Sequence, residues 1–363
     1  MKKIFLETHN INNLKSGFGQ FNLNLVKALA EETDFLKDHK IICNYNKNKV
    51  KKELGDSIFY KKYRQITRYP LFRVKTKFDL WHSVNQNTKI EPFLKSTPYL
   101  LTIHDVNFME EDSGERLDFR IKQFKGKIAR SNAIVYISEF AKRSTHQHFK
   151  IPNIPEYVIY NGNTFNNVNN SNKDLKTSPF SPPSNKPFIF SIGQMVEKKN
   201  FHTLIEMVKF LPDLNLILAG DIRTEYTERL KKIIIDEKLS NRVHIVGRIN
   251  DDEKIYYYKN CLAFTFPSLR EGFGLPVLEA MTFGKPVFLA NKSSLPEIGG
   301  KHSFYWDHFD PEYMADIFTK GMHDFNTNEN FYINEYIKHS KKFTWENAAK
   351  QYIEVYKSIL ENA

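Results

Sequence analysis

Residues 270–281 read REGFGLPVLEAM, and this run contains the pattern that decides the fold. Pro276 suits the first position of an α-helix, where its missing N–H costs nothing. Gly284 suits the position just after a helix ends, because a left-handed backbone is common there. We therefore expect a strand–loop–helix unit. Glu271 would lie in the loop after the strand, and Glu279 in the first turns of the helix.

The residue types in this run suit ligand binding. Both glutamates can face the carboxyl end of a parallel sheet, where open α/β sheets bind ligands. Gly272 and Gly274 let the backbone approach a ligand closely, and a helix start offers amides to an anion. Two glutamates eight positions apart fit a tight turn with surface carboxylates equally well. The glycines, the proline and the preceding FPS of residues 266–268 make the whole run more specific.

Short apolar runs alternate with helical patterns on both sides of this unit. In the first half, strands are expected at 4–6, 41–42, 99–103 and 133–137, and helices at 19–29 and 116–130. In the second half, strands are expected at 188–190, 214–218, 243–246, 263–266 and 287–290, with helices at 200–211, 225–238, 251–259 and 276–283. This alternation predicts two successive doubly wound α/β units with parallel sheets.

The segment Asn161–Lys186 is rich in Asn, Ser and Pro and has little that could pack, so it is the expected linker. The predicted domains are residues 1–178 and residues 179–344. The end of the chain, 345–363, is expected to form a helix that packs back on the first domain. The apolar face of that helix is Ala348, Tyr352, Val355, Tyr356 and Ile359.

Length and composition narrow the class of protein. The 363 residues suit two domains better than one core. No apolar stretch approaches the ~18 residues of a membrane span, and polar residues soon after the start interrupt a signal-peptide core, so a cytoplasmic protein is expected. Cys43 and Cys261 are too few for a disulfide framework or a four-cysteine zinc site. They are interpreted as core side chains.

The net charge of +11 is concentrated in one stretch. Its basic residues are Lys47, Lys49, Lys51, Lys52, Lys61, Lys62, Arg64, Arg68, Arg73, Lys75 and Lys77, against Glu53 and Asp56, with Tyr60, Tyr63, Tyr69, Phe72 and Phe78 interleaved. One interpretation is a solvated surface whose aromatic side chains point inward. The other is attachment to an anionic membrane leaflet, where each cation adds about 1 kcal/mol. Nucleic acid ranks third, because no nucleic-acid-binding motif accompanies the charge.

The run at 270–281 resembles the signature of the retaining glycosyltransferase family 4, the group 1 glycosyltransferases. Its members have the GT-B fold, in which two Rossmann-like doubly wound domains face each other across a cleft. The resemblance extends over nearly the whole chain. It implies transfer of a hexosyl unit from a nucleoside diphosphate sugar to an acceptor hydroxyl with retention, in surface polysaccharide or glycolipid synthesis. It also implies that Glu271 and the backbone of Gly272, Phe273, Gly274 and Leu275 hold the donor sugar, and that Glu279 binds the ribose.

Residues 191–200, SIGQMVEKKN, resemble the segment of that family that grips the diphosphate, with Gly193 in the loop and Lys199 at the basic position. A lysine at a helix start supplies the point charge that a diphosphate needs. Many relatives carry arginine where this chain has Gln194. Either another cation compensates, or diphosphate binding depends mainly on Lys199. The candidate cations are Arg223, Arg248 and Arg270.

Further segments match the family in order. Residues 246–248, with Arg248, resemble the loop that contacts the nucleobase. Residues 16–20, SGFGQ, resemble the glycine loop beside the donor phosphates, with Gly17 and Gly19 as donor-binding positions. Ser138 and Asn161 fall in two further segments that contact the donor.

His104 matches the histidine that the family places near the reacting sugar. A lone histidine is more often structural, but its place at the end of the strand 99–103 favours a catalytic role. Asp105 could orient His104 or cap a turn. Glu271, His104 and Lys199 are the expected catalytic residues.

The sequence contains no Asp-x-Asp motif, so neither a metal nor another cofactor is required by the pattern. The implied partners are a nucleotide sugar and a glycan or lipid-linked acceptor, with an anionic membrane surface at the inner face and no nucleic acid. A GT-B-fold epimerase or phosphorylase would have no reason to keep the whole 270–281 run. A non-catalytic nucleotide-sugar-binding protein would be expected to lack Glu271, Glu279 or Lys199, and all three are present.

Overall fold

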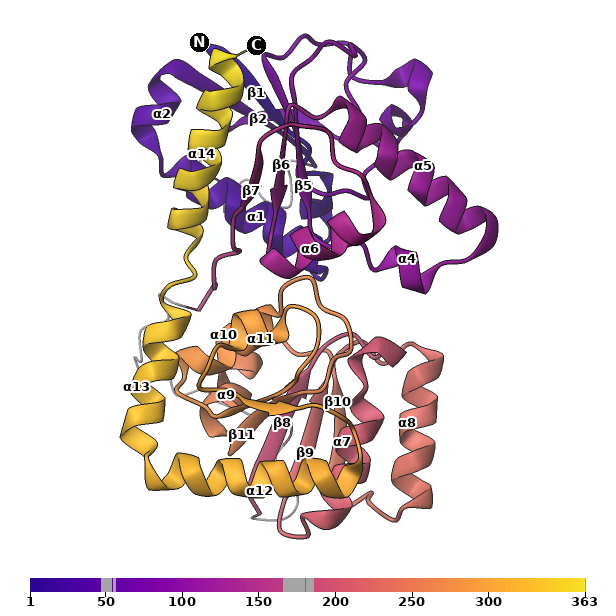
Figure 1. Cartoon of the computed structure of the whole chain (residues 1–363), viewed down its shortest axis with the longest axis vertical. Helices are drawn as coiled ribbons and strands as arrows, with labels where there is room; N and C mark the ends of the chain where they lie inside the picture. Colours follow the sequence, from indigo (N-terminus) through magenta and orange to yellow (C-terminus); the bar gives the residue numbers. More distant parts are fainter. Residues whose placement is uncertain (47–53, 55–56, 166–179, 181–185, 363) are drawn as a thin grey trace. The chain divides into compact units, whose positions relative to one another are not determined.

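The computed structural model describes residues 1–46, 54, 57–165, 180 and 186–362. The chain divides into two compact units, which comprise residues 1–164 with 343–363 (unit 1) and residues 165–342 (unit 2) (Figure 1). The expected boundary at 178–179 lies outside the described residues. The same holds for Lys47, Lys49, Lys51, Lys52, Glu53 and Asp56 of the basic stretch.

Unit 1 is built on a seven-stranded sheet in the order β3-β2-β1-β4-β5-β6-β7, and every neighbouring pair is parallel. Its central strands read as nearly continuous apolar runs because helices cover both faces of a parallel sheet; all five residues of β5 are buried. The strands are β1 Lys2–Leu6, β2 His39–Tyr45, β3 Phe59–Lys62, β4 Leu80–Ser83, β5 Tyr99–Ile103, β6 Ala133–Tyr136 and β7 Glu156–Val158.

The helices of unit 1 include the last helix of the chain. They are α1 Gly17–Ala30, α2 Thr33–Asp38, α4 Phe108–Glu111, α5 Gly114–Arg130, α6 Glu139–His148 and α14 Trp345–Glu361. The C-terminal helix α14 packs against α1. Its buried Tyr356 hydroxyl lies 2.8 Å from Nδ1 of His82 on β4, and its Tyr352 hydroxyl 3.1 Å from Oγ1 of Thr102 on β5. Buried hydrogen bonds therefore fix α14 to the centre of the sheet.

Unit 2 is built on a six-stranded parallel sheet in the order β10-β9-β8-β11-β12-β13. Its strands are β8 Phe188–Ile192, β9 Asn215–Ala219, β10 Val243–Gly247, β11 Ala263–Phe266, β12 Val287–Ala290 and β13 Phe304–Trp306. Its helices are α7 Phe201–Met207, α8 Glu225–Asp236, α9 Asp251–Asn260, α10 Leu275–Thr282, α11 Leu295–Gly299, α12 Pro311–Thr327 and α13 Glu329–Ser340. In Figure 1, α12 and α13 are two consecutive helices, and in the chain they follow β13.

Every strand and helix expected from the sequence is present within a few residues. The expected helix 200–211 is shorter, because α7 ends at Met207 and a 3-10 helix, Val208–Phe210, follows. The sequence did not indicate β3, β4, β7 and β13, which have three or four residues each. It also did not indicate the helices α2, α4, α6, α11, α12 and α13. Cys43 and Cys261 are buried free thiols, and burial raises the pKa of each to about 12, which confirms their assignment to the core. None of the helices in the described ranges combines the length and apolar character of a membrane span.

Each sheet has one point at which the strand order reverses. In unit 1 this point lies between β1 and β4, and in unit 2 between β8 and β11. Open α/β sheets bind ligands outside the carboxyl ends of the strands at such a switch point. The loops that follow β8 and β11, and those that follow β1 and β4, are therefore the places where binding residues are expected.

Candidate active site

The start of α10 lies just beyond β11, at the switch point of unit 2, and Gly274 shapes it. Gly274 has a φ of +106°, and a Cβ at this position would lie 2.9 Å from Cδ2 of Leu295. Only glycine adopts this backbone without strain. Pro276 lies in the first turn of α10, where a missing N–H costs nothing. The sequence thus directs the positive end of the α10 dipole toward the edge where ligands bind.

Lys199 and Glu271 form a partly buried ion pair at the same edge. Lys199 follows β8 and Glu271 follows β11, and their side chains are 13% and 15% exposed. The Lys199 ammonium also lies 4.9 Å from the ring centroid of Phe266. The backbone N–H of Leu269 donates to the carbonyl of Lys198 over 2.8 Å, which joins the two loops. The structure therefore brings the basic position and the first glutamate of the run into one cluster.

Two serines that follow β12 hold the backbone of this loop. Ser293 Oγ accepts from the Glu271 N–H over 3.1 Å. Ser294 Oγ lies 3.0 Å from the carbonyl of Glu271 and 2.7 Å from that of Phe273. Sequence reasoning missed both serines, and their only signal is a polar pair directly after a predicted strand. They fix the backbone path of the segment from Glu271 to Gly274.

Glu279 has different neighbours from Glu271. It is 2% exposed. The Lys254 ammonium lies 2.6 Å from its Oε1, and the Tyr258 hydroxyl donates to its Oε2 over 2.8 Å. Burial, together with the nearby Glu279 charge, raises the pKa of Tyr258 well above its ordinary value. Both partners lie on α9, so this glutamate joins α10 to α9. Lys254 and Tyr258 were not identified from the sequence.

Gly193 lies directly after β8 and lets Lys199 approach the backbone. A Cβ on Gly193 would lie 3.3 Å from Cε of Lys199. The Gly193 N–H donates to the carbonyl of Ala219 over 3.0 Å, which fixes the loop to the end of β9. Gln194 is exposed beside it. Because the Gln194 side chain is a neutral amide, the cation of this loop that pairs with Glu271 is Lys199.

Arg248 and Arg223, two of the candidate compensating cations, meet on one carboxylate. Arg248 Nη2 lies 2.6 Å from Oδ2 of Asp221, and Arg223 Nε lies 3.0 Å from Oδ1. Hydrogen bonds from Arg223 lower the pKa of Asp221 against the effect of burial, and Arg248 adds to this. The cluster lies in the loops that follow β9 and β10 and carries one net positive charge.

In unit 1, the predicted glycine loop forms the start of α1. Ser16 caps the helix, because its Oγ accepts from the Gly19 N–H over 3.0 Å. A Cβ on Gly19 would lie 2.1 Å from the carbonyl oxygen of Asn13, whereas a Cβ on Gly17 would meet no atom within 4 Å. The two glycines therefore differ: Gly19 is required for packing, and Gly17 leaves space beside the helix start.

His104 is buried directly after β5 and has a defined tautomer. Its Nε2 lies 2.9 Å from the carbonyl oxygen of Val84, which can only accept, so Nε2 carries the proton and Nδ1 the lone pair. Phe18 and Phe21 contact the ring edge-on, with centroids 4.9 and 4.5 Å away. Burial lowers the pKa of His104 to about 4. At neutral pH, Nδ1 can therefore accept a hydrogen bond from a hydroxyl group.

Ser138 and Asn161, the other two expected donor contacts, differ in their hydrogen bonds. Ser138 is fully buried, and its Oγ accepts from the Ala141 N–H over 3.0 Å, so it caps α6. Asn161 follows β7, and its Oδ1 is buried with no hydrogen-bond partner in the part of the chain that the structure describes. A buried acceptor without a partner is unusual, which makes Asn161 the better ligand contact of the two.

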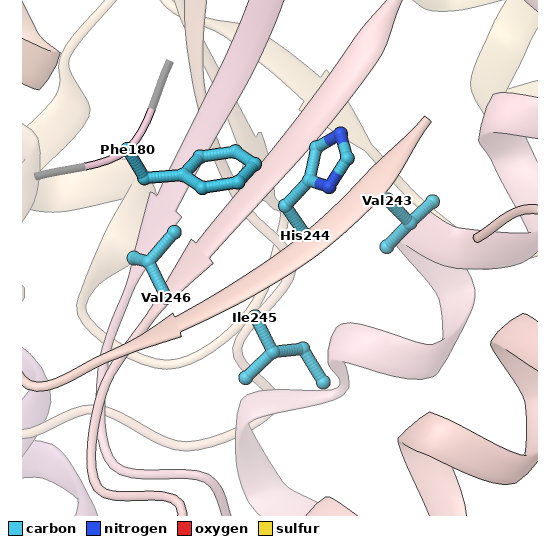
Figure 2. Close-up of a pocket in the computed structure, with 5 residues that line it drawn as sticks. All are labelled: Phe180, Val243, His244, Ile245 and Val246. Atoms are coloured by element: carbon cyan, nitrogen blue, oxygen red, sulfur yellow. The ribbon is translucent and has the colours of Figure 1, made fainter. Parts of the chain in front are cut away.

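A hollow of about 390 Å³ lies beside β10 and is lined by Phe180 and residues 243–246. Figure 2 shows the ring of Phe180 facing that of His244, with ring centroids 4.7 Å apart. Only Val246, from the expected nucleobase loop, belongs to a predicted ligand segment. Because no carboxylate or cation lines this hollow, the chemistry is better placed at the loops after β8 and β11.

The basic segment of unit 1 presents several apolar side chains to solvent. Tyr69 is 62% exposed, Leu71 81% and Phe72 52%. The expectation that the aromatic side chains of this stretch point inward is therefore wrong for Tyr69 and Phe72, and it holds for the buried Phe78. The two 3-10 turns at 65–68 and 70–72 contain no buried residue. Neither turn therefore packs a side chain into the core.

Part of the chain matches a known protein family. Residues 172–338 match the family described as glycosyl transferases group 1. The chain is 30% identical to the serotype-specific mannosyltransferase WbdA of Escherichia coli over 78% of its own length, and it spans about a third (34%) of that relative. It is 31% identical to the Escherichia coli O-antigen chain mannosyltransferase B, over 46% of this chain and 45% of that protein.

Solved structures share the architecture over the whole chain. A glycosyltransferase from Rickettsia africae superposes with a TM-score of 0.76 at 20% identity, covering 100% of this chain and 99% of that one. HepE from Anabaena, in complex with UDP and glucose, gives 0.75 at 17% identity, covering 99% and 100%. The expected fold is therefore confirmed: the chain has the GT-B fold of glycosyltransferases, and its residues 172–338 match the group 1 glycosyltransferases.

Proposed function

We propose that this chain is a retaining glycosyltransferase of family 4 that transfers a hexosyl unit from a nucleoside diphosphate sugar to an acceptor hydroxyl. The observation that carries the proposal is the Lys199–Glu271 pair at the switch point of unit 2. It places one cation and one carboxylate beside the glycine-shaped start of α10. A cation and a helix start suit a diphosphate, and a carboxylate suits sugar hydroxyls.

The residues of the site take different roles in this reaction. The Lys199 ammonium and the α10 start stabilise the negative charge that grows on the leaving diphosphate. Glu271 orients Lys199 and accepts hydrogen bonds from the donor sugar, and Glu279 accepts from the ribose. His104 accepts a hydrogen bond from a sugar hydroxyl at Nδ1. The bond between the anomeric carbon and the phosphate oxygen breaks, and the bond to the acceptor oxygen forms on the same face. The acceptor proton passes to the leaving phosphate oxygen. Because the new bond forms on the face from which the diphosphate leaves, the configuration is retained.

The relatives suggest the transferred sugar. WbdA and the O-antigen chain mannosyltransferase B are mannosyltransferases by name, and O-antigen chain synthesis is a surface-polysaccharide activity. The structural neighbour HepE holds UDP and glucose. We take mannose as the transferred unit and a growing surface glycan or lipid-linked glycan as the acceptor. UDP-glucose is the rival donor in every test.

A lipid-linked acceptor requires the enzyme to work at a membrane surface. The segment 57–77 carries Lys61, Lys62, Arg64, Arg68, Arg73, Lys75 and Lys77 beside the exposed Tyr69, Leu71 and Phe72. Cations attract anionic lipid headgroups, and exposed apolar side chains insert at the headgroup boundary. This surface supports peripheral attachment to the inner face of the membrane.

The donor site can be tested by thermal shift. Wild-type protein is heated with GDP-mannose, UDP-glucose, GDP or UDP. A ligand at 100 times its Kd stabilises the fold by about 2.7 kcal/mol. We expect one nucleotide class to raise Tm, and Lys199→Met and Glu279→Ala to reduce this shift. Lys209→Met is the matched control, because Lys209 pairs with Glu237 over 2.8 Å on the surface. Equal shifts in Lys199→Met and Lys209→Met would contradict the proposed donor site.

A further inference from the structure

The carboxylate of Glu279 is held by two side chains from α9. Lys254 and Tyr258 are one helical turn apart, so they lie on the same side of that helix. The Lys254 ammonium lies 2.6 Å from Oε1 of Glu279, and the Tyr258 hydroxyl donates to Oε2 over 2.8 Å. Each carboxylate oxygen therefore has its own partner on α9, and the two contacts together fix the plane of the carboxylate.

Tyr258 is a rigid hydrogen-bond donor. Its side chain is fully buried, and its ring packs against those of Phe190, Phe264 and Phe283, with centroids 5.4, 5.5 and 6.0 Å away. Burial, together with the nearby Glu279 charge, raises the pKa of Tyr258 well above its ordinary value. The hydroxyl therefore keeps its proton at neutral pH and donates it to the carboxylate.

The position of Lys254 is fixed as well. Its side chain is 20% exposed, and its ammonium lies 5.1 Å from the ring centroid of Phe165, whose face attracts a cation. The start of α9 has a capping box, in which Asn250 Oδ1 accepts from the Glu253 N–H over 2.9 Å and Glu253 Oε2 from the Asn250 N–H over 2.7 Å. The helix that carries both partners of Glu279 thus has a defined beginning.

The Glu279 carboxylate keeps acceptor capacity on both oxygens. An ionised carboxylate has about four lone-pair positions; Lys254 uses one on Oε1 and Tyr258 uses one on Oε2. The Glu279 side chain is only 2% exposed, so a ligand can approach it from few directions. A ribose has hydroxyls on the adjacent 2′ and 3′ carbons. A carboxylate held in one plane can accept from both hydroxyls, one at each oxygen.

We propose that Lys254 and Tyr258 are positioning residues for the donor nucleotide, which orient Glu279 so that its two oxygens accept hydrogen bonds from the 2′- and 3′-hydroxyls of the ribose. This inference depends on the proposed donor site and adds the residues that make it selective for ribose over deoxyribose. Both side chains act through Glu279. Loss of either should therefore weaken the binding of ribonucleotides and leave the binding of deoxyribonucleotides nearly unchanged.

The test measures the Kd of the full chain for GDP and UDP, and for the 2′-deoxy and 3′-deoxy analogues of each, by isothermal titration calorimetry. These nucleotides contain no sugar besides the ribose, so their comparison reports on the ribose alone. The variants are Tyr258→Phe, Lys254→Met, Lys254→Arg and Glu279→Gln. The matched control is Tyr336→Phe, because Tyr336 of the same unit is 1% exposed and donates to the carbonyl of His302 over 2.8 Å. Folding of each variant is compared by Tm.

We expect wild type and Tyr336→Phe to bind the ribonucleotide about tenfold tighter than either deoxy analogue, because each analogue lacks one hydrogen bond to a charged group. Glu279→Gln should abolish this preference, and Tyr258→Phe and Lys254→Met should reduce it to about threefold or less. Lys254→Arg should restore it, since a cation remains beside Oε1. Tyr258→Phe keeps the buried ring, so it decides the test even where Lys254→Met does not fold. A purely structural role would lower Tm without changing the preference.

The outcomes separate the inference from the proposed function. If Glu279→Gln loses the preference while Tyr258→Phe keeps that of Tyr336→Phe, the inference is overturned and the donor site stands. If wild type binds GDP or UDP and discriminates against neither deoxy analogue, Glu279 does not bind the ribose, which also overturns the inference. A wild type that binds no nucleotide would overturn the proposed function and the inference with it.

Discussion

The ammonium of Lys254 lies 2.6 Å from the carboxylate of Glu279, and the Tyr258 hydroxyl occupies the other carboxylate oxygen at 2.8 Å. The second glutamate of the run at 270–281 is therefore part of a buried polar network that links two helices. A ribose that binds this carboxylate must use its remaining lone pairs. The same side chain supports the fold and, in the proposed function, the donor.

Removing Lys254 should destabilise unit 2. Lys254→Met leaves a carboxylate that is 2% exposed without its cation, and breaking a buried pair in this way costs about 3 to 5 kcal/mol. The double variant Lys254→Met/Glu279→Gln removes both charges and should recover more than 1 kcal/mol of that loss, because residues in contact are not additive. Urea unfolding of wild type, Lys254→Met, Glu279→Gln and the double variant gives the four free energies of unfolding. Additive effects of the two substitutions would show that the pair does not couple.

Gly17 and Gly19 should respond to alanine in opposite ways. In Gly19→Ala the new Cβ would lie 2.1 Å from a backbone oxygen, so the free energy of unfolding should fall by about 3 kcal/mol, as for overpacking. In Gly17→Ala the Cβ has open space, and alanine in place of glycine at a compatible backbone position gains about 0.4 to 1 kcal/mol, because the unfolded chain loses conformational freedom. We expect Gly17→Ala to keep or raise Tm. The family resemblance implies that the donor phosphates lie beside this loop, so the added methyl group should also lower turnover. Unchanged turnover would remove Gly17 from the site.

The buried histidine His104 should make stability depend on pH. Burial lowers its pKa from 6.5 to about 4. Between pH 4 and pH 6.5 the unfolded chain binds more protons than the folded chain. The contribution of His104 to the free energy of unfolding is therefore full above pH 6.5 and is lost as the pH falls toward 4. Each pH unit is worth about 1.4 kcal/mol. From pH 7 to pH 4.5, the free energy of unfolding of wild type should fall about 2 kcal/mol more than that of His104→Gln. Equal losses would show that His104 is not held neutral.

The exposed apolar residues of unit 1 should matter for membrane binding. Wild type should float with vesicles containing about 30% anionic lipid and much less with neutral vesicles, and salt should weaken this binding. Leu71→Glu/Phe72→Glu should reduce binding about tenfold. Ile235→Glu is the control, since Ile235 is 67% exposed on α8 of unit 2. Equal binding of wild type to both kinds of vesicle would contradict the role of the cations. Unchanged binding of Leu71→Glu/Phe72→Glu would contradict the role of the exposed apolar side chains.

The strongly apolar strands could be predicted from the sequence, and the mixed ones could not. β5 and β12 are buried throughout, and their apolar runs identify them. β4 reads LWHS and was missed, because buried His82 depends on Tyr356, 274 positions away. β7 and β13 have three residues each, too few for a pattern to show.

In the candidate site, too, local features could be predicted from the sequence and long-range contacts could not. The run at 270–281 indicated the loop and the helix start, and Gly284 indicated the left-handed residue after the helix, because these depend on local backbone preferences. The left-handed backbone of Gly274 was not predicted. The pairing of side chains depends on which loops the sheet brings together. Lys199 meets Glu271 across 72 positions and Lys254 meets Glu279 across 25. Neither pairing can be read from spacing.

The most direct test of the transferase activity is to incubate the purified chain with GDP-mannose or UDP-glucose and octyl α-mannoside, and to record the ¹H NMR spectrum of the product. The proposed function predicts one new glycosidic linkage with the anomeric configuration of the donor, and its loss in Lys199→Met but not in Lys209→Met. A product of inverted configuration would contradict the proposal that the new bond forms on the face from which the diphosphate leaves. Transfer at the wild-type rate by Lys199→Met would contradict the assignment of the site to the Lys199–Glu271 pair.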